Sequence, residues 1–519
     1  MKEKKGNAIE DMRKMIVFFN EKWNGFKPLY KLFSTDKEKL VYDTGTNKIL
    51  SCEDGAYFFL EAYQKNDFNK ALAEMKQTYS DSEIANSLLI IKNAVETEGV
   101  LQTDSRKIKM KDQVFERVTE LGKEYLPMIT LEVTSRCNLR CIYCIYNEPV
   151  KYARNHGPAE MTWDIARKSI DLLAANSKKA KELFVTFYGG EPLLNLKLIK
   201  KSVPYAQECF KGRPLHFSLT TNCTLINENT ARFFAENNFS ILASIDGPPD
   251  IHNSYRINTQ GRGSFDNSMK GLQMLVDIYG NEKNSKIALN MVFAPPFSEE
   301  KINHISQFLQ ENSYLANLRA HITYAVAGTI PAEKMAENKG YENDKNLFEW
   351  AEEQFLNQYP HGNKTFLSKD TIEKSMYKLY SRHISDEPVY QLYPNGCCNP
   401  AVRKVFIEAD GKIRLCERIY STAPTIGDVE KGIDYDLVKR VFVDEYIEMS
   451  NRDCAKCWVG RLCSLCYVDA YENKKFSYEK KRNMCRIIRH LVERDLKLYA
   501  RLIKIDPEGL NYLGDYKIM

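Results

Sequence analysis

Short apolar runs alternate with amphipathic helical patterns through the middle of the chain. The runs, rich in β-branched and aromatic residues, cover residues 129–134, 183–187, 215–220, 241–245, 287–293 and 318–324. Between them, apolar positions recur at helical spacing, as in Ala166, Ser169, Ile170 and Leu173. Nearly continuous apolar strands separated by helices are typical of a parallel sheet with covered faces. The pattern predicts an α/β fold whose six strand–helix units form a partial (β/α)6 barrel.

Polar motifs follow two of these predicted strands. Gly189, Gly190 and Glu191 come directly after the second strand, and Ser244 and Asp246 end the fourth. In barrels of parallel strands, binding and catalytic groups collect at the carboxyl ends of the strands. Paired glycines let a backbone approach a ligand closely, and a carboxylate accepts hydrogen bonds from an ammonium group. These segments are candidate ligand-binding sites, although each is also an ordinary turn sequence.

The first hundred residues have a different pattern. Apolar stretches at 28–33, 40–43 and 48–51 surround a turn at 44–47, and helical patterns follow at 56–64, 69–78 and 82–97. We expect a small domain of strands followed by three helices. Ahead of it, Ile9, Met12, Ile16 and Phe19 predict an amphipathic helix that packs on the body of the protein.

Composition indicates ordinary globular domains. The 519 residues are 43% hydrophobic, which suits about two to four domains. A net charge of +5 in a chain with 69 acidic residues argues against nucleic acid as a partner. The N-terminus lacks an apolar signal-peptide region, and no stretch approaches the ~18 apolar residues of a membrane span. We expect a cytoplasmic protein, without a membrane partner, whose 14 cysteines bind metal rather than form disulfides.

Cys137, Cys141 and Cys144 follow the first predicted barrel strand at C-x3-C-x2-C spacing. A [4Fe–4S] cluster normally takes one cysteine at each of its four irons. Three thiolates would therefore leave one iron open to bind and reduce another molecule. The alternative is a zinc loop, but zinc prefers four closed ligands, and no histidine stands beside these cysteines in the sequence. The spacing favours the cluster.

Eight further cysteines lie between residues 397 and 485. Cys398 and Cys416 flank a predicted hairpin with an Asp410-Gly411 turn, which brings two thiols together. The others follow as Cys454-x2-Cys457-x5-Cys463-x2-Cys466 and then Cys485. A double zinc ribbon also contains C-x2-C pairs, so this region alone leaves zinc and iron–sulfur open. Three cysteines stand alone and are expected to be small buried hydrophobes: Cys52, Cys209 and Cys223.

These motifs resemble a known family. The first motif, with Tyr143 before its last cysteine, resembles the signature of the radical S-adenosylmethionine (SAM) superfamily. The C-terminal cysteines resemble the SPASM extension of radical SAM peptide-modifying enzymes. That extension usually ends in C-x3-C, and the C-x2-C ending here resembles the thioether-forming branch, the sactipeptide and ranthipeptide maturases of ribosomally made peptides (RiPPs). The N-terminal pattern resembles a winged-helix RiPP recognition element, although a generic α+β cap fits it nearly as well.

The resemblance implies three [4Fe–4S] clusters, one for radical SAM chemistry and two auxiliary. Cys137, Cys141 and Cys144 would hold the first cluster. The outer auxiliary cluster would take Cys454, Cys457, Cys463 and Cys485. The inner auxiliary cluster would take Cys398, Cys416 and Cys466, with Cys397 as a tentative fourth ligand and an open iron as the preferred alternative.

The resemblance also implies that SAM is bound at the carboxyl ends of the barrel strands. The candidate SAM-binding residues are Tyr143, Gly189, Gly190, Glu191, Ser244, Asp246 and Arg256. The segment that contains Glu191 would hold the SAM amino group. Ser244 and Asp246 would lie near the ribose, and Arg256 near the SAM carboxylate.

The implied activity is the formation of intramolecular thioether crosslinks in a precursor peptide by means of a 5′-deoxyadenosyl radical. Partners would be a ribosomal precursor peptide, with a leader and a cysteine-containing core, and an electron donor such as flavodoxin or ferredoxin. The leader would pair with a strand edge at 39–43 or 48–51. The alternatives are a carbon–carbon (cyclophane-type) crosslink, formylglycine formation of the anaerobic sulfatase-maturating type and a zinc-bearing scaffold. For the formylglycine alternative, Glu417 is a tentative catalytic base that could instead pair with Arg418.

The expected domain order follows from these assignments. It comprises an N-terminal helix (1–27), a recognition-element-like peptide-binding domain (28–115), a radical SAM partial barrel (120–345), a helical bridging region (346–395), a SPASM auxiliary-cluster domain (396–490) and a C-terminal helix and tail (491–519).

Overall fold

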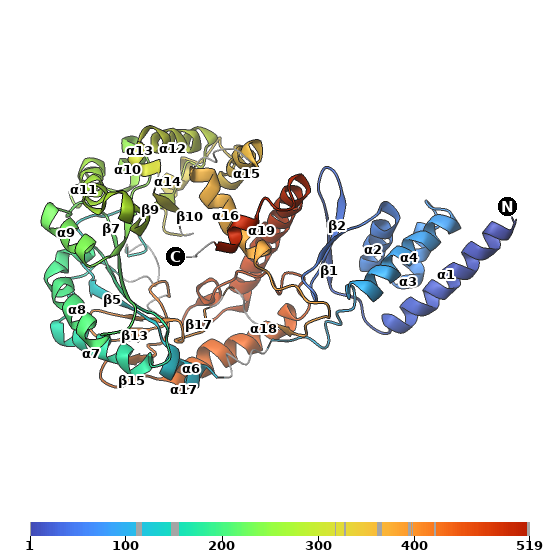
Figure 1. The fold of residues 1–519 in the computed structure, drawn as a ribbon, viewed down its shortest axis with the longest axis horizontal. Coiled ribbons are helices and arrows are strands. Elements are labelled where there is room, and N and C mark those ends of the chain that lie inside the picture. The colour runs from blue at the N-terminus through green and yellow to red at the C-terminus, as the bar shows by residue number, and fades with distance from the viewer. Residues whose placement is uncertain are drawn as a thin grey trace.

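The computed structural model describes residues 2–110, 117–146, 155–316, 318–325, 328–360, 366–392, 396, 398–419 and 422–515. Figure 1 shows a curved α/β body, with the N-terminal module on one side of it and the C-terminal cysteine-containing region between the two. The first cysteine motif follows β5 (Met128–Thr134) and therefore lies in the body.

Six parallel strands form the centre of the body. They are β5 (Met128–Thr134), β6 (Leu183–Gly189), β7 (Leu215–Thr221), β8 (Ser240–Ser244), β9 (Ile287–Phe293) and β10 (Arg319–Tyr324). They pair in chain order, each parallel to the next. The predicted α/β fold with a parallel sheet is confirmed, and its strands begin and end within two residues of the predicted positions.

Helices cover the outer face of this sheet (Figure 1). They are α7 (Trp163–Asn176), α8 (Leu196–Cys209), α9 (Glu228–Glu236), α10 (Pro249–Tyr255), α11 (Phe265–Lys283) and α12 (Glu299–Glu311). The α7 residues predicted to share a face, among them Ile170 and Leu173, are completely buried. Thr162 begins α7 by accepting a hydrogen bond from the backbone N–H of Ile165. Alternate strand residues such as Phe187 and Phe217 pack under the helices, so the intervening side chains face the interior of the curved sheet.

Two C-terminal strands extend the barrel sheet, which the sequence did not predict. β12 (Lys404–Ile407) pairs parallel to β5, and β13 (Ile413–Arg414) returns antiparallel to β12. The predicted hairpin is confirmed, with Gly411 in the turn at φ +88°, a conformation that favours glycine. Because β12 pairs with β5, the hairpin that leads to Cys416 belongs to the same sheet as the strand that precedes Cys137.

The N-terminal module contains the predicted strands and helices. β1 (Tyr30–Ser34), β2 (Lys39–Asp43) and β3 (Ile49–Ser51) form an antiparallel sheet in that order. α2 (Asp54–Lys65), α3 (Phe68–Met75) and α4 (Asp81–Thr97) follow. Phe19 and Trp23, at and just after the end of α1 (Lys2–Lys22), are buried beside Tyr63 and Phe68. The predicted amphipathic helix therefore packs in the core of the module.

The remaining helices and strands lie before, between and after these elements in the chain. They are β4 (Lys109–Met110), α6 (Val118–Tyr125), α13 (Ser313–Ala316), α14 (Ala332–Ala336), α15 (Leu347–Gln358), α16 (Phe366–Tyr380), β11 (Gln391–Leu392), β14 (Gly427–Asp428), β15 (Gly432–Ile433), α17 (Tyr435–Val438), α18 (Tyr446–Cys454), β16 (Tyr471–Glu472), β17 (Lys475–Phe476) and α19 (Tyr478–Ile505). The domain boundary that we expect at residue 490 falls inside α19, which carries Cys485. Among the described helices, none has the length and apolar character needed to cross a bilayer.

Candidate functional site

The first cysteine motif occupies the loop after β5. Burial raises the pKa of Cys137 and of Cys141 to about 12 and also raises the pKa of Cys144. The backbone N–H of Leu139 donates to Cys137 Sγ at 3.4 Å, and that of Tyr146 donates to Cys144 Sγ at 3.5 Å. Such donors stabilise thiolates, and buried thiolates need a cation. The three thiols therefore fit a [4Fe–4S] cluster as its ligands.

The two glycines after β6 support the cysteine loop. A Cβ atom on Gly189 would lie 2.1 Å from the backbone oxygen of Thr134, and one on Gly190 would lie 2.2 Å from that of Arg136. The N–H of Gly190 donates to the Thr134 carbonyl at 2.9 Å, and the N–H of Glu191 donates to the Arg136 carbonyl at 2.8 Å. We predicted that the glycine backbone approaches a ligand closely. In the structure, it approaches the loop that carries Cys137.

Glu191 is held by internal hydrogen bonds. Its carboxylate accepts from the backbone N–H groups of Leu193 and Asn222 and from Thr221 Oγ1, at 2.8–3.1 Å. It is 1% exposed, and burial raises its pKa to about 7. Its side chain joins the end of β6 to the end of β7, and its contact with the SAM amino group stays a prediction.

The segment after α10 holds the other side of the cysteine loop. The N–H of Arg140 donates to the carbonyl of Ile257 at 2.7 Å, and the N–H of Ile142 donates to the carbonyl of Tyr255 at 2.9 Å. Arg256 lies between these two points of attachment, with Nη1 4.0 Å from Cys141 Sγ. The loop pairing thus brings the predicted arginine beside a predicted cluster ligand.

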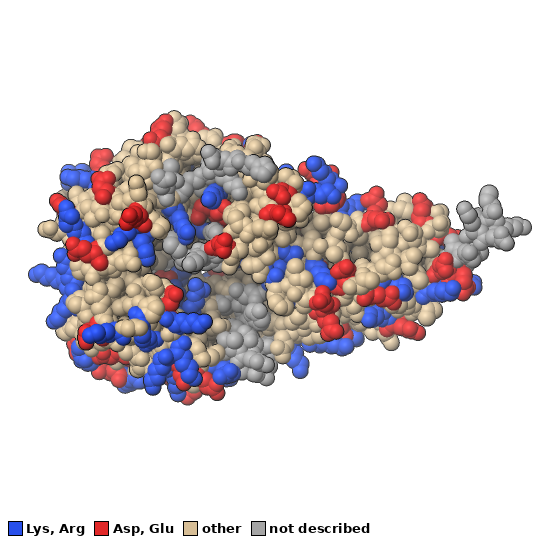
Figure 2. Space-filling model, viewed as in Figure 1, with Lys and Arg blue, Asp and Glu red and all other residues tan. Residues whose placement is uncertain are grey.

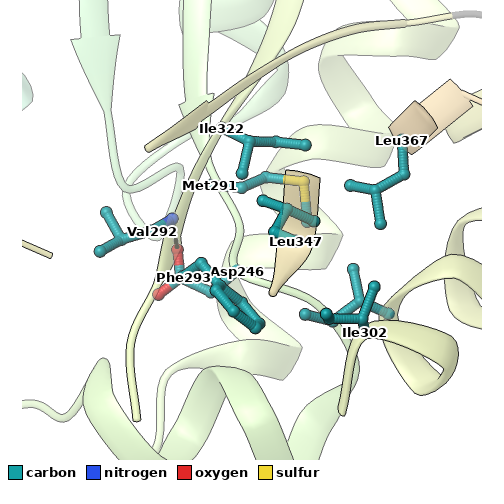
Figure 3. Close-up of a pocket in the computed structure, with 9 residues that line it drawn as sticks. Asp246, Met291, Val292, Phe293, Ile302, Ile322, Leu347 and Leu367 are labelled. Carbon is teal, nitrogen blue, oxygen red and sulfur yellow. Dashed lines mark hydrogen bonds between the residues drawn. The ribbon is translucent and has the colours of Figure 1, made fainter. Parts of the chain in front are cut away.

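Asp246 and Arg256 form a buried ion pair. Arg256 Nε donates to Asp246 Oδ2 at 3.0 Å, and the two side chains are 7% and 2% exposed. Tyr143 Oη donates to the same carboxylate oxygen, and the N–H of Val292 donates to Oδ1 at 3.0 Å. Figure 3 shows the Asp246 carboxylate turned towards Val292, beside apolar side chains such as Met291. The cavity they line is only about 10 Å³. Asp246 therefore orients Tyr143 and Arg256, while its contact with the SAM ribose stays a prediction.

His252 supports the backbone of this pair. It is completely buried, its Nδ1 accepts from the N–H of Asp246 at 3.4 Å, and its Nε2 lies 3.1 Å from Ser264 Oγ. Ser264 Oγ in turn donates to the carbonyl of Arg256 at 2.8 Å. These contacts match a neutral imidazole with its proton on Nε2. Burial, aided by the charge of Arg256, lowers the pKa of His252 to about 4.

Three further residues complete the account of this end of the barrel. Ser244 is the last residue of β8 and is 6% exposed, in the position expected for it. Cys223 is completely buried, as predicted, and its thiol donates to the carbonyl of Thr221 at 3.8 Å. His156 was not among the residues selected from the sequence, and its Nε2 lies 3.7 Å from Cys144 Sγ although twelve residues separate the two.

The cysteines outside the predicted clusters differ from one another. Cys52 is half-buried against the core of the N-terminal module. Cys209 is exposed. The expectation of a buried side chain is wrong for Cys209, because it is the last residue of α8, where the helix face turns to solvent.

The C-terminal cysteines fall into two groups. Cys454, Cys457, Cys463 and Cys485 lie within electrostatic range of one another. Cys466 instead interacts with Cys398 and Cys416. The structure thus brings together the two sets of thiols expected for the outer and inner auxiliary clusters. Cys397 lies outside the described residues.

The outer group contains a buried cation. Lys481 is 4% exposed, and its Nζ donates to Cys454 Sγ at 3.2 Å. Burial favours neutral lysine, but the thiols of Cys454 and Cys485 outweigh that effect and raise the pKa of Lys481. A permanent positive charge beside four thiolates fits a metal cluster that carries net negative charge.

Glu417 pairs with a lysine in the hairpin. Both carboxylate oxygens of Glu417 lie 2.8 Å from Lys404 Nζ. Glu417 thus forms a bidentate pair with Lys404 of β12, while its pairing with Arg418 and its role as a base stay predictions.

Within the described residues, no three His, Cys, Asp or Glu side chains converge on one point as ligands of a single metal ion do. The predicted clusters do not require such convergence, because each thiolate of a [4Fe–4S] cluster binds a separate iron.

A cavity of about 700 Å³ occupies the interior of the barrel. Its walls include Thr186, Ser218 and Thr220 from β6 and β7, side chains of α16 and α19, and Leu462 and Ser464 from the cysteine-containing region. Ser464 stands between Cys463 of the outer group and Cys466 of the inner group. A molecule in this cavity would contact both the barrel and the segment that joins the two thiol groups.

The strand edges predicted for peptide binding differ in availability. β2 lies between β1 and β3, so both of its edges are paired. The expectation that an edge at 39–43 binds a peptide is therefore wrong. β3 is an edge strand, paired only with β2, and it stays a candidate for the addition of a peptide strand.

Comparisons with known proteins find similarity to one superfamily over part of the chain. Residues 131–309 match the model of the radical SAM superfamily. The serine-type anaerobic sulfatase-maturating enzyme of Bacteroides thetaiotaomicron is 34% identical over 155 residues, which are 30% of this chain and only 37% of that enzyme. The cysteine-type anaerobic sulfatase-maturating enzyme of Clostridium novyi is 25% identical over 388 residues, which are 73% of this chain and 97% of that enzyme.

The fold agrees with a solved structure. Native anSMEcpe with bound AdoMet, another name for SAM, superposes with a TM-score of 0.53 at 20% identity, covering 75% of this chain and 100% of that one. The matched domain contains Cys137, Cys141 and Cys144, and its superfamily uses a [4Fe–4S] cluster and SAM. Residues 131–309 therefore match the radical SAM superfamily, and the chain is similar over most of its length to an anaerobic sulfatase-maturating enzyme.

Proposed function

We propose that this enzyme forms intramolecular thioether crosslinks, between cysteine sulfur and carbon, in a ribosomally made precursor peptide. The observation that carries the proposal is the cavity of about 700 Å³ whose wall includes Ser464, between Cys463 and Cys466. A peptide bound there would contact the barrel strands on one side and Ser464, two residues before Cys466, on the other.

In this proposal, Cys137, Cys141 and Cys144 hold the radical SAM cluster, and Arg256 binds the SAM carboxylate. Arg256 is suited to that role because Asp246 fixes its Nε, which leaves the guanidinium end near Cys141. A cluster held by these three cysteines would supply one electron to SAM, and the resulting 5′-deoxyadenosyl radical would remove a hydrogen atom from the peptide. The buried network of Tyr143, Asp246 and His252 keeps Arg256 in a single orientation.

The inner thiol group would take part in bond formation. Cys398, Cys416 and Cys466 are its described members, against four cysteines in the outer group. A cluster with a free iron would lower the pKa of a substrate thiol and accept an electron. The overall change removes one hydrogen from carbon and one from sulfur for each C–S bond. One hydrogen atom would become part of 5′-deoxyadenosine. The other would leave as a proton and an electron, and the electron would pass to an auxiliary cluster and then back to the oxidised form of the electron donor.

The N-terminal module would bind the leader of the precursor. Antiparallel pairing with β2 at Val41↔Leu50 leaves the backbone groups of Ile49 and Ser51 on the outer edge of β3. An extended peptide can pair with such an edge without displacing any other strand. This arrangement would tether the core of the peptide to the same molecule that modifies it.

The test is the mass of a cysteine-containing precursor peptide after reaction with anaerobically reconstituted enzyme, SAM and reductant. Each thioether lowers the mass by about two units and protects one cysteine from alkylation. A carbon–carbon crosslink gives the same mass loss but leaves every thiol reactive. A product whose cysteines all react with the alkylating agent contradicts the thioether assignment.

A second candidate is formylglycine formation on a protein cysteine or serine. It is favoured by the similarity to the Clostridium novyi enzyme, which spans 97% of that protein. In this case Glu417 would act near Cys416, although its pair with Lys404 holds it. A cysteine peptide would lose its sulfur, which the same mass measurement detects.

A further inference from the structure

The barrel cavity has an unusual surplus of positive charge. Five cationic side chains line it, against two carboxylates. The cations are Lys286, Arg319, Lys374, Lys378 and Arg494, and the carboxylates are Asp370 and Asp495. On the molecular face in Figure 2, by contrast, the two signs are interspersed.

The two carboxylates are already paired. Asp370 accepts from Lys374 Nζ at 2.8 Å, and Asp495 pairs with Arg494 at 2.9 Å. Lys374 Nζ also lies 3.1 Å from His321 Nδ1, and burial lowers the pKa of His321, so this histidine is neutral at pH 7. None of these contacts uses the remaining three cations.

Lys286, Arg319 and Lys378 make no ion pair within the part of the chain that the structure describes. They stand at different positions around the cavity: Lys286 just before β9, Arg319 at the start of β10 and Lys378 on α16. Lys378 lies within electrostatic range of Asp495 and of Cys463, and both Arg319 and Lys378 are exposed at the cavity wall. Cations placed in this way attract a carboxylate that comes within a few ångströms of them.

The size of the cavity fits a segment of peptide. A volume of about 700 Å³ lies within the range of about 300 to 1,000 Å³ typical of ligand pockets. Polar groups are present besides the charges: Thr186 Oγ1 and Ser218 Oγ lie 2.8 Å apart on adjacent strands and face the cavity. The site therefore suits a ligand with both hydrogen-bonding backbone and negative side chains.

We propose that the barrel cavity binds carboxylate side chains of the substrate, so that the peptide segment modified by this enzyme is acidic. The inference rests on the proposed function, since it assumes that a peptide occupies the barrel. It adds the chemical class of the substrate, namely a segment with Asp or Glu near its cysteine, with Arg319 and Lys378 as the residues that determine this specificity.

The experiment compares two synthetic twelve-residue peptides, each with one cysteine. The first carries three aspartates, and its twin carries three asparagines at the same positions. Binding to the anaerobically reconstituted full-length enzyme with SAM is measured by isothermal titration calorimetry. We expect the aspartate peptide to bind about tenfold more tightly, which corresponds to about 1.4 kcal/mol, and this advantage to shrink at high salt.

Two variants locate the effect. The double variant Arg319→Met with Lys378→Met removes both charges but keeps apolar stems of similar length, and it should bind the two peptides equally. Lys270→Met, on the outer face of α11, is the matched control and should keep the preference. Iron content and circular dichroism identify a variant that has failed to fold. In that case, two single variants replace the double variant. Arg319→Lys keeps the charge and should keep the preference for the aspartate peptide, whereas Arg319→Gln removes the charge and should reduce that preference.

The outcomes separate the inference from the proposed function. Equal binding of the two peptides by the unaltered enzyme overturns the inference, and so does a preference that survives in the double variant. If inorganic sulfate binds in the cavity but the aspartate peptide does not, the site holds small anions and the inference is also overturned. If the aspartate peptide binds as expected but is never crosslinked, the cavity assignment stands and the thioether function fails.

Discussion

Thr44 Oγ1 donates a hydrogen bond of 3.0 Å to the backbone carbonyl of Trp458, the residue after Cys457. Lys31 lies over the Trp458 ring, 5.4 Å from its centre, and Arg461 Nη1 donates to the carbonyl of Gly45. The turn between β2 and β3 thus rests against the segment that carries the outer thiol group. Removal of the whole module would uncover Trp458, so leader binding is better tested by a single change at the edge of β3.

Ser51→Pro is such a change. Ser51 is exposed, and its backbone N–H points away from β2, so proline removes a donor for an added strand while β2–β3 pairing stays intact. We expect binding of a leader peptide to weaken at least tenfold, with SAM cleavage in the absence of peptide unchanged. Fluorescence anisotropy of a labelled leader measures the first, and 5′-deoxyadenosine formation measures the second. Ser51→Ala is the control, and an equal loss of binding in both variants would contradict a role for this edge.

Gly190→Ala tests the support of the cysteine loop. The added Cβ would lie 2.2 Å from the Arg136 carbonyl oxygen and 3.0 Å from the N atom of Cys137, so the backbone before the first ligand must move. We expect about a third of the iron to be lost, because this loop would hold one of the three proposed clusters. Gly514→Ala is the control, since its φ is not positive and the nearest atom to a Cβ there is Tyr380 Oη at 3.7 Å, an ordinary van der Waals contact. Full iron content in the Gly190 variant would mean that the loop tolerates the shift.

Asp246→Asn tests the orientation of Arg256. Asparagine still accepts from the N–H of Val292, but it loses the charge that pairs with Arg256 Nε. We expect the KM for SAM to rise about tenfold with cluster content unchanged. Asp250→Asn, an exposed residue of α10, should leave the KM as it is. An unchanged KM in the Asp246 variant would show that Arg256 is held by other contacts.

His252 should make stability depend on pH. Its pKa is lowered from 6.5 to about 4 in the folded protein, so the unfolded chain binds a proton that the folded chain refuses. Its stabilising contribution is therefore fully present above pH 6.5 and is lost as the pH falls to about 4. Between pH 7 and 5, we expect this residue to account for a loss of about 2 kcal/mol in the free energy of unfolding.

Guanidinium unfolding at pH 7 and pH 5 measures that loss. His252→Asn keeps an acceptor for the N–H of Asp246 and removes the titrating group, so its unfolding midpoint should fall less over this range. His490→Asn, on the exposed side of α19, serves as the control. Parallel pH dependence in all three proteins would mean that another group dominates.

The sequence predicted the parts of the structure that depend on local pattern. Apolar strands separated by helices placed β5 to β10 within two residues, because a buried parallel strand is a nearly continuous apolar run. The resemblance to the SPASM extension, and not the spacing by itself, separated the two C-terminal thiol groups. The pairing of strands far apart in the sequence could not be predicted. The four residues of β12 pair with β5 across more than 270 positions, and their apolar pattern does not indicate which strand they pair with.

Side-chain partners were the least predictable feature of the site. Asp246, Gly189 and Gly190 were selected for contact with a ligand, but Asp246 binds Arg256 and Tyr143, and the glycines contact the cysteine loop. Lys481 beside Cys454 and His156 beside Cys144 depend on how helices and loops meet, which no spacing rule encodes. A sequence motif identifies residues that matter to a site before it identifies what each one contacts.

The most direct test of the central claim is the origin of the hydrogen atom that the 5′-deoxyadenosyl radical takes up. A precursor peptide with deuterium only at the Cβ atoms of its cysteines is treated with reconstituted enzyme, SAM and reductant, and the 5′-deoxyadenosine is examined by mass spectrometry. A thioether enzyme abstracts hydrogen from the acceptor carbon of another residue, so we predict 5′-deoxyadenosine without deuterium and a peptide about two mass units lighter for each crosslink. Deuterium in the 5′-deoxyadenosine, with loss of sulfur from the peptide, would contradict the account and identify formylglycine formation.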